Sequence, residues 1–126
     1  MNRKRRNAYE KLANQIEDTV GTDCPDPNAF AVIIPPDNDS MSPVFRPNDR
    51  VVFAPNSEPG NGEAVIAKLN DGRVLFRVFH AEGKTVRLES LNPNYPPVRF
   101  KRSEFTFIYP AWELKRSFRE VPKHNN

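Results

Sequence analysis

The stretch EAVIAKLNDGRVLFRVFHAEGKTVRLE, residues 63–89, consists of three apolar segments separated by two polar turns. The first turn contains Asn70-Asp71-Gly72, which favours the positive backbone angles of a tight hairpin. The second turn is Ala81-Glu82-Gly83-Lys84. The segments themselves cover residues 63–69, 73–79 and 85–89 and are rich in β-branched and aromatic residues, as strands are. The stretch therefore predicts two β-hairpins in series.

Further strands are predicted on both sides of these hairpins. Pro35-Pro36 ends a buried apolar run, and Pro110 interrupts the last segment, which indicates an edge strand or a bend. Residues 91–97 contain three prolines and are predicted to form an ordered loop pinned by Leu91 and Tyr95. The predicted strands outside the hairpins cover residues 29–34, 50–54, 98–100 and 105–114. About seven short strands indicate a mainly β fold.

One amphipathic helix is predicted before these strands, over residues 5–20. Its apolar stripe has four-residue spacing and consists of Ala8, Leu12, Ile16 and Val20. The stripe is open to three interpretations: docking on the domain, pairing with a partner's helix, or the end of a longer protein's linker. The predicted organisation is a basic N-terminal helix and linker (1–28), a β domain (29–116) and a basic C-terminal tail (117–126).

Composition excludes several classes of protein. With 126 residues the chain suits one domain, and no apolar run approaches the roughly 20 residues of a membrane span. No apolar signal segment follows the basic N-terminus, so a cytoplasmic protein is expected. Cys24 is the one cysteine, and with His80 and His124 it provides no zinc spacing. We expect no metal and no cofactor.

Basic residues cluster at the two ends of the chain, whose net charge is +3. The clusters are Arg3-Lys4-Arg5-Arg6 and the set Lys115, Arg116, Arg119 and Lys123. They suit either solvated termini or non-specific attraction of a phosphate backbone. No helix-turn-helix fits before Ala29. DNA is therefore expected to be bound only through a separate domain or through weak, salt-dependent backbone contacts.

A polar turn follows the first predicted strand and reads Asp-Asn-Asp-Ser-Met-Ser-Pro-Val-Phe, residues 37–45. It is predicted to deliver Ser40 to a surface edge, as a nucleophile would be presented. Asp, Asn, Ser and Pro are also common turn formers, so an ordinary junction between strand and loop explains the same residues.

Four motifs in a fixed order carry a family resemblance. They are Asp39-Ser40-Met41-Ser42-Pro43, Arg46-Pro47-Asn48-Asp49 before Val-Val-Phe, Gly62 before an apolar strand, and Leu88-Glu89-Ser90-Leu91-Asn92-Pro93-Asn94-Tyr95-Pro96. In this order they resemble the C-terminal, peptidase-like domain of the LexA family, which includes lambda-type phage repressors and UmuD. The resemblance covers residues 29–114. It implies a compact LexA-like (signal-peptidase-like) β fold, a homodimer, and self-cleavage by a serine and lysine dyad.

The resemblance also implies site residues. Ser40 takes the nucleophile position, Met41 supports the oxyanion site through its backbone, and Arg77 takes the position of the family lysine. An arginine stays protonated and cannot accept the serine proton. Lys68 or Lys84 would have to replace the missing base.

Two further departures from the family point the same way. Asn38 stands where a glycine usually precedes the acidic residue of the motif, and Pro35-Pro36-Asp37 resembles a small insertion. The family cleaves after a small residue and before a glycine, but the only glycine upstream is Gly21, which follows Val20. The linker from Gly21 to Ser40 looks too short to fold back.

The interpretation is therefore a catalytically impaired LexA-like domain, the dimerisation or regulatory module of a phage-type transcriptional repressor. A protein regulator or antirepressor is a possible partner, and the SOS response is the setting that the resemblance implies. The alternative is an active serine autopeptidase using Ser40. Alternating aromatic residues near the C-terminus suit either a dimer face or core packing; they are Phe105, Phe107, Tyr109 and Trp112.

Overall fold

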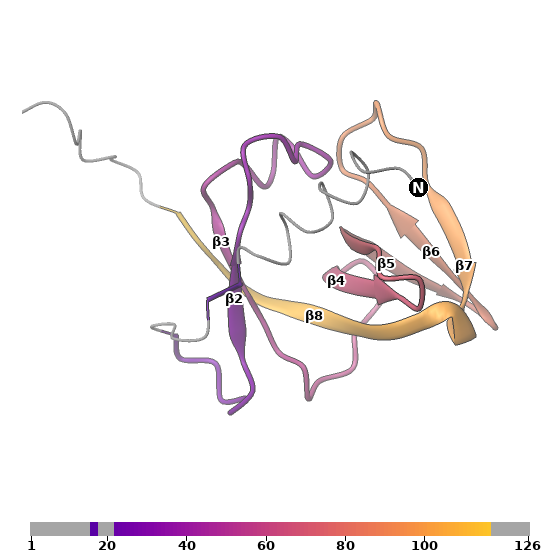
Figure 1. Cartoon of the computed structure of the whole chain (residues 1–126), viewed down its shortest axis with the longest axis horizontal. Coiled ribbons are helices and arrows are strands. Elements are labelled where there is room, and N and C mark those ends of the chain that lie inside the picture. The colour runs from indigo at the N-terminus through magenta and orange to yellow at the C-terminus, as the bar shows by residue number, and fades with distance from the viewer. Residues whose placement is uncertain (1–15, 18–21, 117–126) are drawn as a thin grey trace, which may run out of the picture.

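The computed structural model describes residues 16–17 and 22–116, and these residues form one antiparallel sheet of eight strands in the order β1-β2-β3-β8-β4-β5-β6-β7 (Figure 1). Their bounds are β1 Ile16–Glu17, β2 Phe30–Ile33, β3 Arg50–Phe53, β4 Ala64–Leu69, β5 Val74–Glu82, β6 Thr85–Glu89, β7 Val98–Lys101 and β8 Phe105–Lys115, with a short 3₁₀ turn at Arg102–Glu104. The mainly β prediction is confirmed. All seven predicted strands are present, and β5 continues three residues beyond its predicted end at Phe79.

The long strand β8 joins the two halves of the sheet. Its first part pairs with β4 and its last part with β3, and Figure 1 shows it curving as it passes between them. Pro110 lies opposite Val65 at this change of partner, and its carbonyl accepts a hydrogen bond of 3.0 Å from Ala54 N–H. Proline has no N–H to donate to the ladder, and here it lies where β8 changes partner from β4 to β3. The bend is confirmed, and the edge-strand alternative is wrong.

Of the predicted N-terminal helix, only Ile16 and Glu17 lie among the described residues. They form β1, in which Ile16 pairs with Val32 and Glu17 with Ala31 of β2. At these two positions the helical prediction is wrong, because β2 offers a strand edge whose backbone groups β1 satisfies. The rest of the predicted helix lies outside the described residues.

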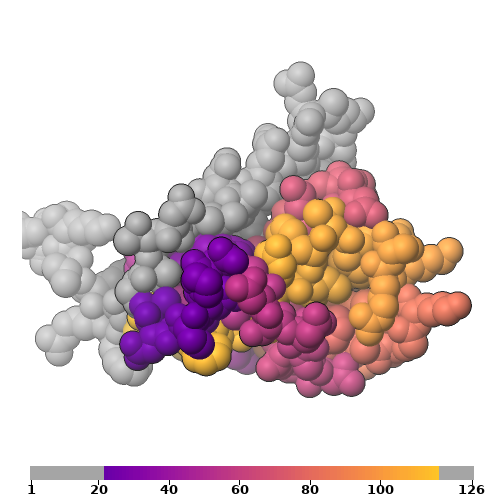
Figure 2. All heavy atoms as spheres, turned by 90° about the horizontal axis from the view of Figure 1, so that it is seen from below, coloured from indigo at the N-terminus to yellow at the C-terminus, as the bar shows by residue number. Residues whose placement is uncertain are grey.

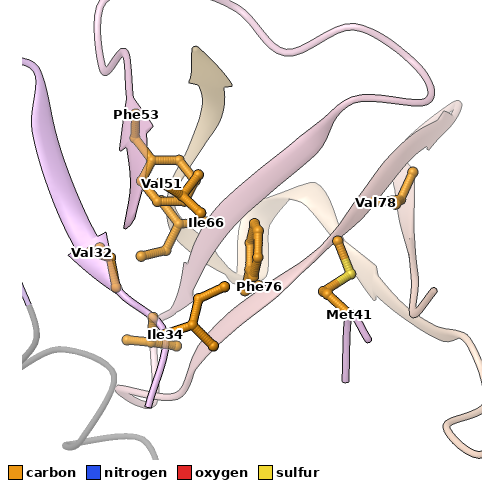
Figure 3. Packing of buried hydrophobic residues seen from close by; sticks show 9 residues of the cluster. Val32, Ile34, Met41, Val51, Phe53, Ile66, Phe76 and Val78 are labelled. Atoms are coloured by element: carbon orange, nitrogen blue, oxygen red, sulfur yellow. The ribbon is translucent and has the colours of Figure 1, made fainter. Parts of the chain in front are cut away.

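Two apolar clusters form the core. The first includes Met41 from the turn after β2, together with residues of β2 to β5 (Figure 3). Its members are Val32, Ile34, Met41, Val51, Phe53, Ile66, Val74, Phe76 and Val78. The second cluster contains Val65, Ala67, Phe79, Val86 and Leu88. Burying a Met side chain stabilises a fold by about 1.5–3 kcal/mol, so Met41 anchors the turn that carries Ser40.

The aromatic stripe of β8 is divided between core and surface. Phe107 and Tyr109 pack against the first cluster with their rings stacked 4.2 Å apart, and Phe105 packs against the second. Trp112 is 50% exposed. Core packing is therefore the correct interpretation for three of the four residues, and Trp112 remains on the surface.

The segment from Thr22 to Asn28 is fixed to the domain by polar contacts. The carboxylate of Asp26 accepts hydrogen bonds from Asn56 N–H (2.7 Å) and from the Asn56 side chain (2.9 Å), and the Thr22 hydroxyl donates to Glu113. Figure 2 shows these indigo residues beside the magenta middle of the chain. The predicted linker is thus ordered where it is described.

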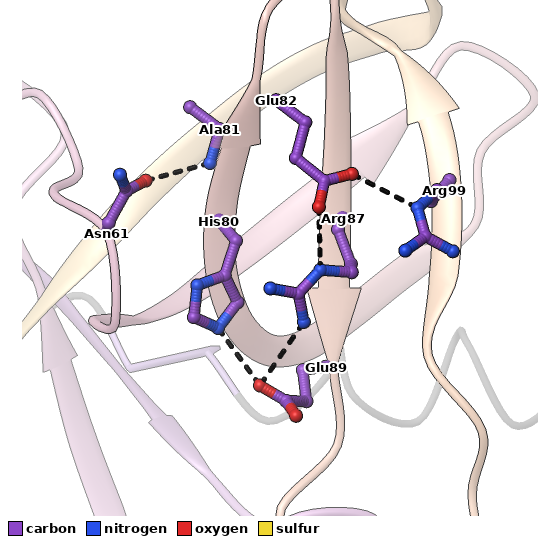
Figure 4. A network of polar contacts seen from close by, with 7 residues as sticks. All are labelled: Asn61, His80, Ala81, Glu82, Arg87, Glu89 and Arg99. Atoms are coloured by element: carbon purple, nitrogen blue, oxygen red, sulfur yellow. Dashed lines mark hydrogen bonds and ion pairs between the residues drawn. The ribbon is translucent and has the colours of Figure 1, made fainter.

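Charged side chains on β5, β6 and β7 are paired with one another (Figure 4). Glu82 accepts hydrogen bonds from Arg87 (2.9 Å) and Arg99 (3.0 Å), and these lower its pKa. Glu89 lies 2.9 Å from His80 and 3.5 Å from Arg87. The basic residues of this face therefore have acidic partners.

Candidate functional site

Ser40 lies in the turn that connects β2 to β3, but it is not on a surface edge. Its exposed fraction is 4%, so the predicted surface location is wrong. Two features bury it: Met41 points into the first core cluster, and the loop of residues 90–95 bonds to the backbone of the turn. The sequence gives no sign of this second feature, since it depends on a contact between residues about fifty positions apart.

Arg77 of β5 contacts the hydroxyl of Ser40. Its Nη1 donates a hydrogen bond of 2.8 Å to Ser40 Oγ and one of 2.9 Å to the carbonyl of Phe76. The structure thus brings together the two residues that the resemblance places at the serine and lysine positions. In place of a lysine amine, the serine faces a guanidinium, which stays protonated.

The Ser40 hydroxyl has a second partner, Asn38. Ser40 Oγ donates to Asn38 Oδ1 over 3.0 Å. The hydroxyl proton is therefore directed at a neutral amide oxygen, while the hydroxyl oxygen accepts a hydrogen bond from a cation. Attack on an amide needs a base that takes the hydroxyl proton, and neither partner is one.

Neither of the lysines considered as substitute bases is placed to act on Ser40. Lys68 pairs with Val74, three residues along β4 from the position opposite Arg77, a shift of about 10 Å. Because side chains alternate along a strand, Lys68 projects from the other face of the sheet. Lys84 lies in the turn after β5, seven residues from Arg77, about 20 Å along an extended chain.

Asn92 holds the Ser40 turn from the other side. Its side-chain nitrogen donates to the carbonyl of Asp39 (3.0 Å), and its backbone N–H donates to the carbonyl of Ser40 (3.1 Å). The hydroxyl of Ser90 also donates to the Ser40 carbonyl. Asn92 is 9% exposed, whereas Leu91 is 36% exposed. The loop is therefore pinned by Asn92 rather than by Leu91.

Tyr95 forms the second predicted pin, and this part of the prediction is confirmed. Its hydroxyl donates to the Asp39 carboxylate, and its ring centre lies 5.8 Å from the Arg77 guanidinium carbon, within the range of a cation–π contact. The hydrogen bond to Asp39 raises the pKa of the Tyr95 phenol; burial and the Asp39 charge act in the same direction. Tyr95 thus connects Asp39 to Arg77.

The end of the turn is fixed by Asp49, a buried carboxylate that the sequence analysis did not single out. Asp49 is 3% exposed and accepts hydrogen bonds from Arg116 Nε (2.8 Å), Arg116 Nη2 (2.6 Å) and Arg46 N–H (2.8 Å). Burial raises the pKa of Asp49, but these hydrogen bonds outweigh it and the net shift is downward. Arg116, predicted to belong to a basic terminal cluster, is therefore part of the support of the turn.

The remaining expectations concern metals, membranes and nucleic acid. Among residues 16–17 and 22–116, no three His, Cys, Asp or Glu side chains gather as metal ligands would. No helix in this part of the chain is long and apolar enough to cross a membrane. Of the two basic clusters, only Lys115 and Arg116 are described; Lys115 lies 3.8 Å from Glu113, and Arg116 pairs with Asp49.

Known proteins match this chain over most of the fold. A family model described as Peptidase S24-like matches residues 5–109. The LexA repressor of Desulfatibacillum aliphaticivorans is 33% identical over 79 residues, which is 62% of this chain and 37% of that protein. The LexA repressor of Zymomonas mobilis subsp. mobilis is 33% identical over 55 residues, 44% of this chain and 25% of that protein.

The chain spans well under half the length of these two relatives, so it is similar to one part of each. The family match includes the Ser40 turn, Arg77 and the loop of residues 90–95. The chain therefore belongs to the Peptidase S24-like family, and its β fold is the peptidase-like domain of the LexA family.

Proposed function

We propose that this chain is a catalytically silent LexA-like domain that serves as the dimerisation or regulatory module of a phage-type transcriptional repressor. In this proposal residues 29–116 are the peptidase-type domain, and DNA is read by a separate domain. The protein acts in the cytoplasm as a homodimer. A protein regulator or antirepressor, rather than self-cleavage, ends the repression.

The proposed loss of catalysis is supported by one observation, the pair of hydrogen bonds at the Ser40 hydroxyl. The proton of the hydroxyl points to Asn38 Oδ1 (3.0 Å), and Arg77 Nη1 lies 2.8 Å from the hydroxyl oxygen. A serine is a weak nucleophile until a base removes its proton. Arg77 keeps its proton at any pH at which the protein is folded, so it does not supply that base.

The dimeric module is supported by the family and by the surface of β8. Trp112 (50% exposed) and Leu114 (37% exposed) are exposed apolar side chains near the C-terminal end of this strand, beside the point at which its register against β3 shifts. Exposed aromatic and aliphatic side chains of this kind are typical of the centre of protein interfaces. We propose that this end of β8 joins the second copy.

An active serine autopeptidase is the alternative function. It is favoured by the presence of Ser40 at the nucleophile position and of Met41 beside it. It is also favoured by the contact of Ser40 with Arg77, the residue at the lysine position. In this alternative another group takes the serine proton after a rearrangement, and alkaline pH accelerates cleavage.

The two functions are separated by the intact mass of the purified protein after long incubation at neutral and at alkaline pH. The silent module stays whole under both conditions, as does Ser40→Ala. Fragments from the wild type that are absent from Ser40→Ala would establish the autopeptidase and remove the silent module.

A further inference from the structure

A pocket of about 500 Å³ opens beside the C-terminal half of β5. It is lined by residues 58–61 of the loop between β3 and β4, by Phe79 and Ala81 of β5, by Arg102 of the 3₁₀ turn and by Ile108 of β8. Pockets of this volume hold small molecules in other proteins. No hydrogen bond in the described part of the chain joins these residues to Ser40, so a ligand bound here would act at a second site.

The wall of the pocket is a loop that is fixed along β5. Gly62, with a φ of 88°, donates its N–H to the carbonyl of Phe79 over 2.8 Å, and Phe79 N–H donates to the carbonyl of Glu63 over 2.9 Å. One residue before Gly62, the side chain of Asn61 accepts a hydrogen bond of 2.8 Å from Ala81 N–H (Figure 4). Three hydrogen bonds therefore preform this wall.

The floor of the pocket is the open side of the second core cluster. Phe79 belongs to that cluster and is 3% exposed, while Ala81 and Ile108 pack against it and remain partly exposed. An apolar group that covers this floor is removed from water, and this removal favours binding. We therefore expect the ligand to carry an apolar side chain.

Two side chains of opposite charge line the pocket, and they do not pair with each other. The exposed carboxylate of Glu58 has no hydrogen-bond or ion-pair partner among residues 16–17 and 22–116. The second carboxylate of the loop, that of Glu63, accepts a hydrogen bond of 2.6 Å from Gly60 N–H. Glu58 is thus the carboxylate that a cationic group of a ligand can bind.

Arg102 provides the positive charge of the pocket. Its N–H donates to the carbonyl of Lys84 (2.9 Å), and its Nε donates to the carbonyl of Gly83 (3.0 Å). Its two terminal nitrogens, Nη1 and Nη2, have no acceptor in the part of the chain that the structure describes. Guanidinium nitrogens bind carboxylates through paired, charge-assisted hydrogen bonds. A ligand carboxylate can therefore bind Arg102 without displacing a contact of the protein.

We propose that this pocket binds a small zwitterion with an apolar side chain, either a free amino acid such as leucine or a short apolar peptide. The carboxylate of the ligand binds the terminal nitrogens of Arg102, and its ammonium group binds the Glu58 carboxylate. Its side chain covers Phe79 and Ile108. A purely anionic ligand would face the like charge of Glu58, and a purely cationic one that of Arg102, so a molecule with both charges is selected.

The test is an NMR titration of the full-length protein at neutral pH with leucine and with leucyl-leucine. At least one of them is expected to shift the amide signals of Asn61 and Ala81 and the methyl signals of Ile108 in a saturable way. Tighter binding of leucine identifies a free amino acid as the ligand, and tighter binding of the dipeptide identifies a peptide. The absence of saturable shifts with both compounds would overturn the proposal.

Blocked forms of the ligand test each charge. The N-acetyl form lacks the ammonium group and the C-terminal amide lacks the carboxylate, so each is expected to bind at least about tenfold more weakly than the zwitterion, the loss of one charge-assisted hydrogen bond. Blocked forms that bind as tightly as the zwitterion would contradict the site. Glycine that binds as tightly as leucine would contradict the role of the apolar floor.

Two variants assign the charges to residues. In Glu58→Gln the N-acetyl form is expected to bind as well as the zwitterion, and in Arg102→Gln the same is expected of the amide. Arg99→Gln, which removes an exposed arginine that pairs with Glu82, is the matched control and should keep both preferences. A variant that loses affinity for all forms equally would show that its residue affects only the shape of the pocket, which contradicts the proposal.

Discussion

Arg116, the first residue after β8, holds both carboxylate oxygens of Asp49, at 2.8 Å and 2.6 Å, and so ties the C-terminal end of the sheet to the turn that carries Ser40. It also donates to the carbonyl of Val44 within that turn (2.8 Å). Asp49 in turn accepts from Arg46 N–H, and its own carbonyl accepts from Ile34 N–H. The position of the turn therefore depends on this ion pair.

Replacing Arg116 by alanine is expected to lower the free energy of unfolding by more than the loss of an exposed ion pair, because it leaves the buried carboxylate of Asp49 without its cation. Chemical denaturation at neutral pH measures the loss. Lys115→Ala, which removes the neighbouring cation at 3.8 Å from Glu113, is the control and should cost at most about 0.5 kcal/mol. Equal losses in the two variants would contradict a special role of Arg116.

The stability of the protein should also decrease in acid through Asp49. The folded state lowers the pKa of Asp49 below its ordinary value of 3.8, so the folded protein holds the proton less tightly than the unfolded chain. The stabilisation is fully present above 3.8 and is lost as pH falls through the folded pKa. Asp49→Asn should show a weaker dependence of unfolding on pH below about 4. Identical acid profiles of the wild type and Asp49→Asn would exclude this contribution.

Tyr95 should titrate at a higher pH than an ordinary tyrosine. The hydrogen bond to Asp39 raises the phenol pKa above 10.0, and Asp39→Asn should therefore lower it again. A ¹³C NMR titration of labelled tyrosine, with Tyr109 as the internal reference, measures the change. A Tyr95 pKa that does not change in Asp39→Asn would contradict this contact.

Trp112 is expected to stabilise the proposed dimer. Trp112→Glu should weaken dimerisation at least tenfold, because a charge would be buried at the centre of the interface. Sedimentation velocity over micromolar concentrations measures the change. Val98→Glu, at a residue 36% exposed on β7, is the matched control. A wild type that is monomeric throughout this range would remove the dimeric module.

Much of the fold was predictable because its strands are short apolar segments between strong turn signals. Gly72 has a φ of 97° in the hairpin between β4 and β5, as the Asn-Asp-Gly sequence predicts. The predictions that failed depend on pairing between segments that are distant in the sequence. Ile16 fits a helical stripe, yet it pairs with Val32 of β2. Pro110 was compatible with an edge strand or with a bend, and only the bend is correct, because β8 lies between β3 and β4 and changes partner there.

The candidate site divides in the same way. Family motifs identified the residues, and the contact of Ser40 with Arg77 agrees with the position that the resemblance gave Arg77. Asn92 and Asp49 were quoted within motifs but given no role, since neither their burial nor their partners can be deduced from neighbouring residues. The signal that was available is a polar residue between apolar neighbours, as at Asp49 before Arg-Val-Val-Phe.

Silencing of Ser40 by Arg77 is tested most directly by labelling of Ser40 with a fluorophosphonate, followed by intact mass. This reagent reacts with an activated serine and needs no cleavable peptide bond. The wild type should remain unlabelled at neutral and alkaline pH, whereas Arg77→Lys should be labelled faster as rising pH deprotonates the new lysine. Arg77→Met tests whether removal of the guanidinium alone makes Ser40 reactive. The double variant Arg77→Lys with Ser40→Ala controls for labelling of residues other than Ser40. Labelling of wild-type Ser40 at the rate of Arg77→Lys would contradict the account.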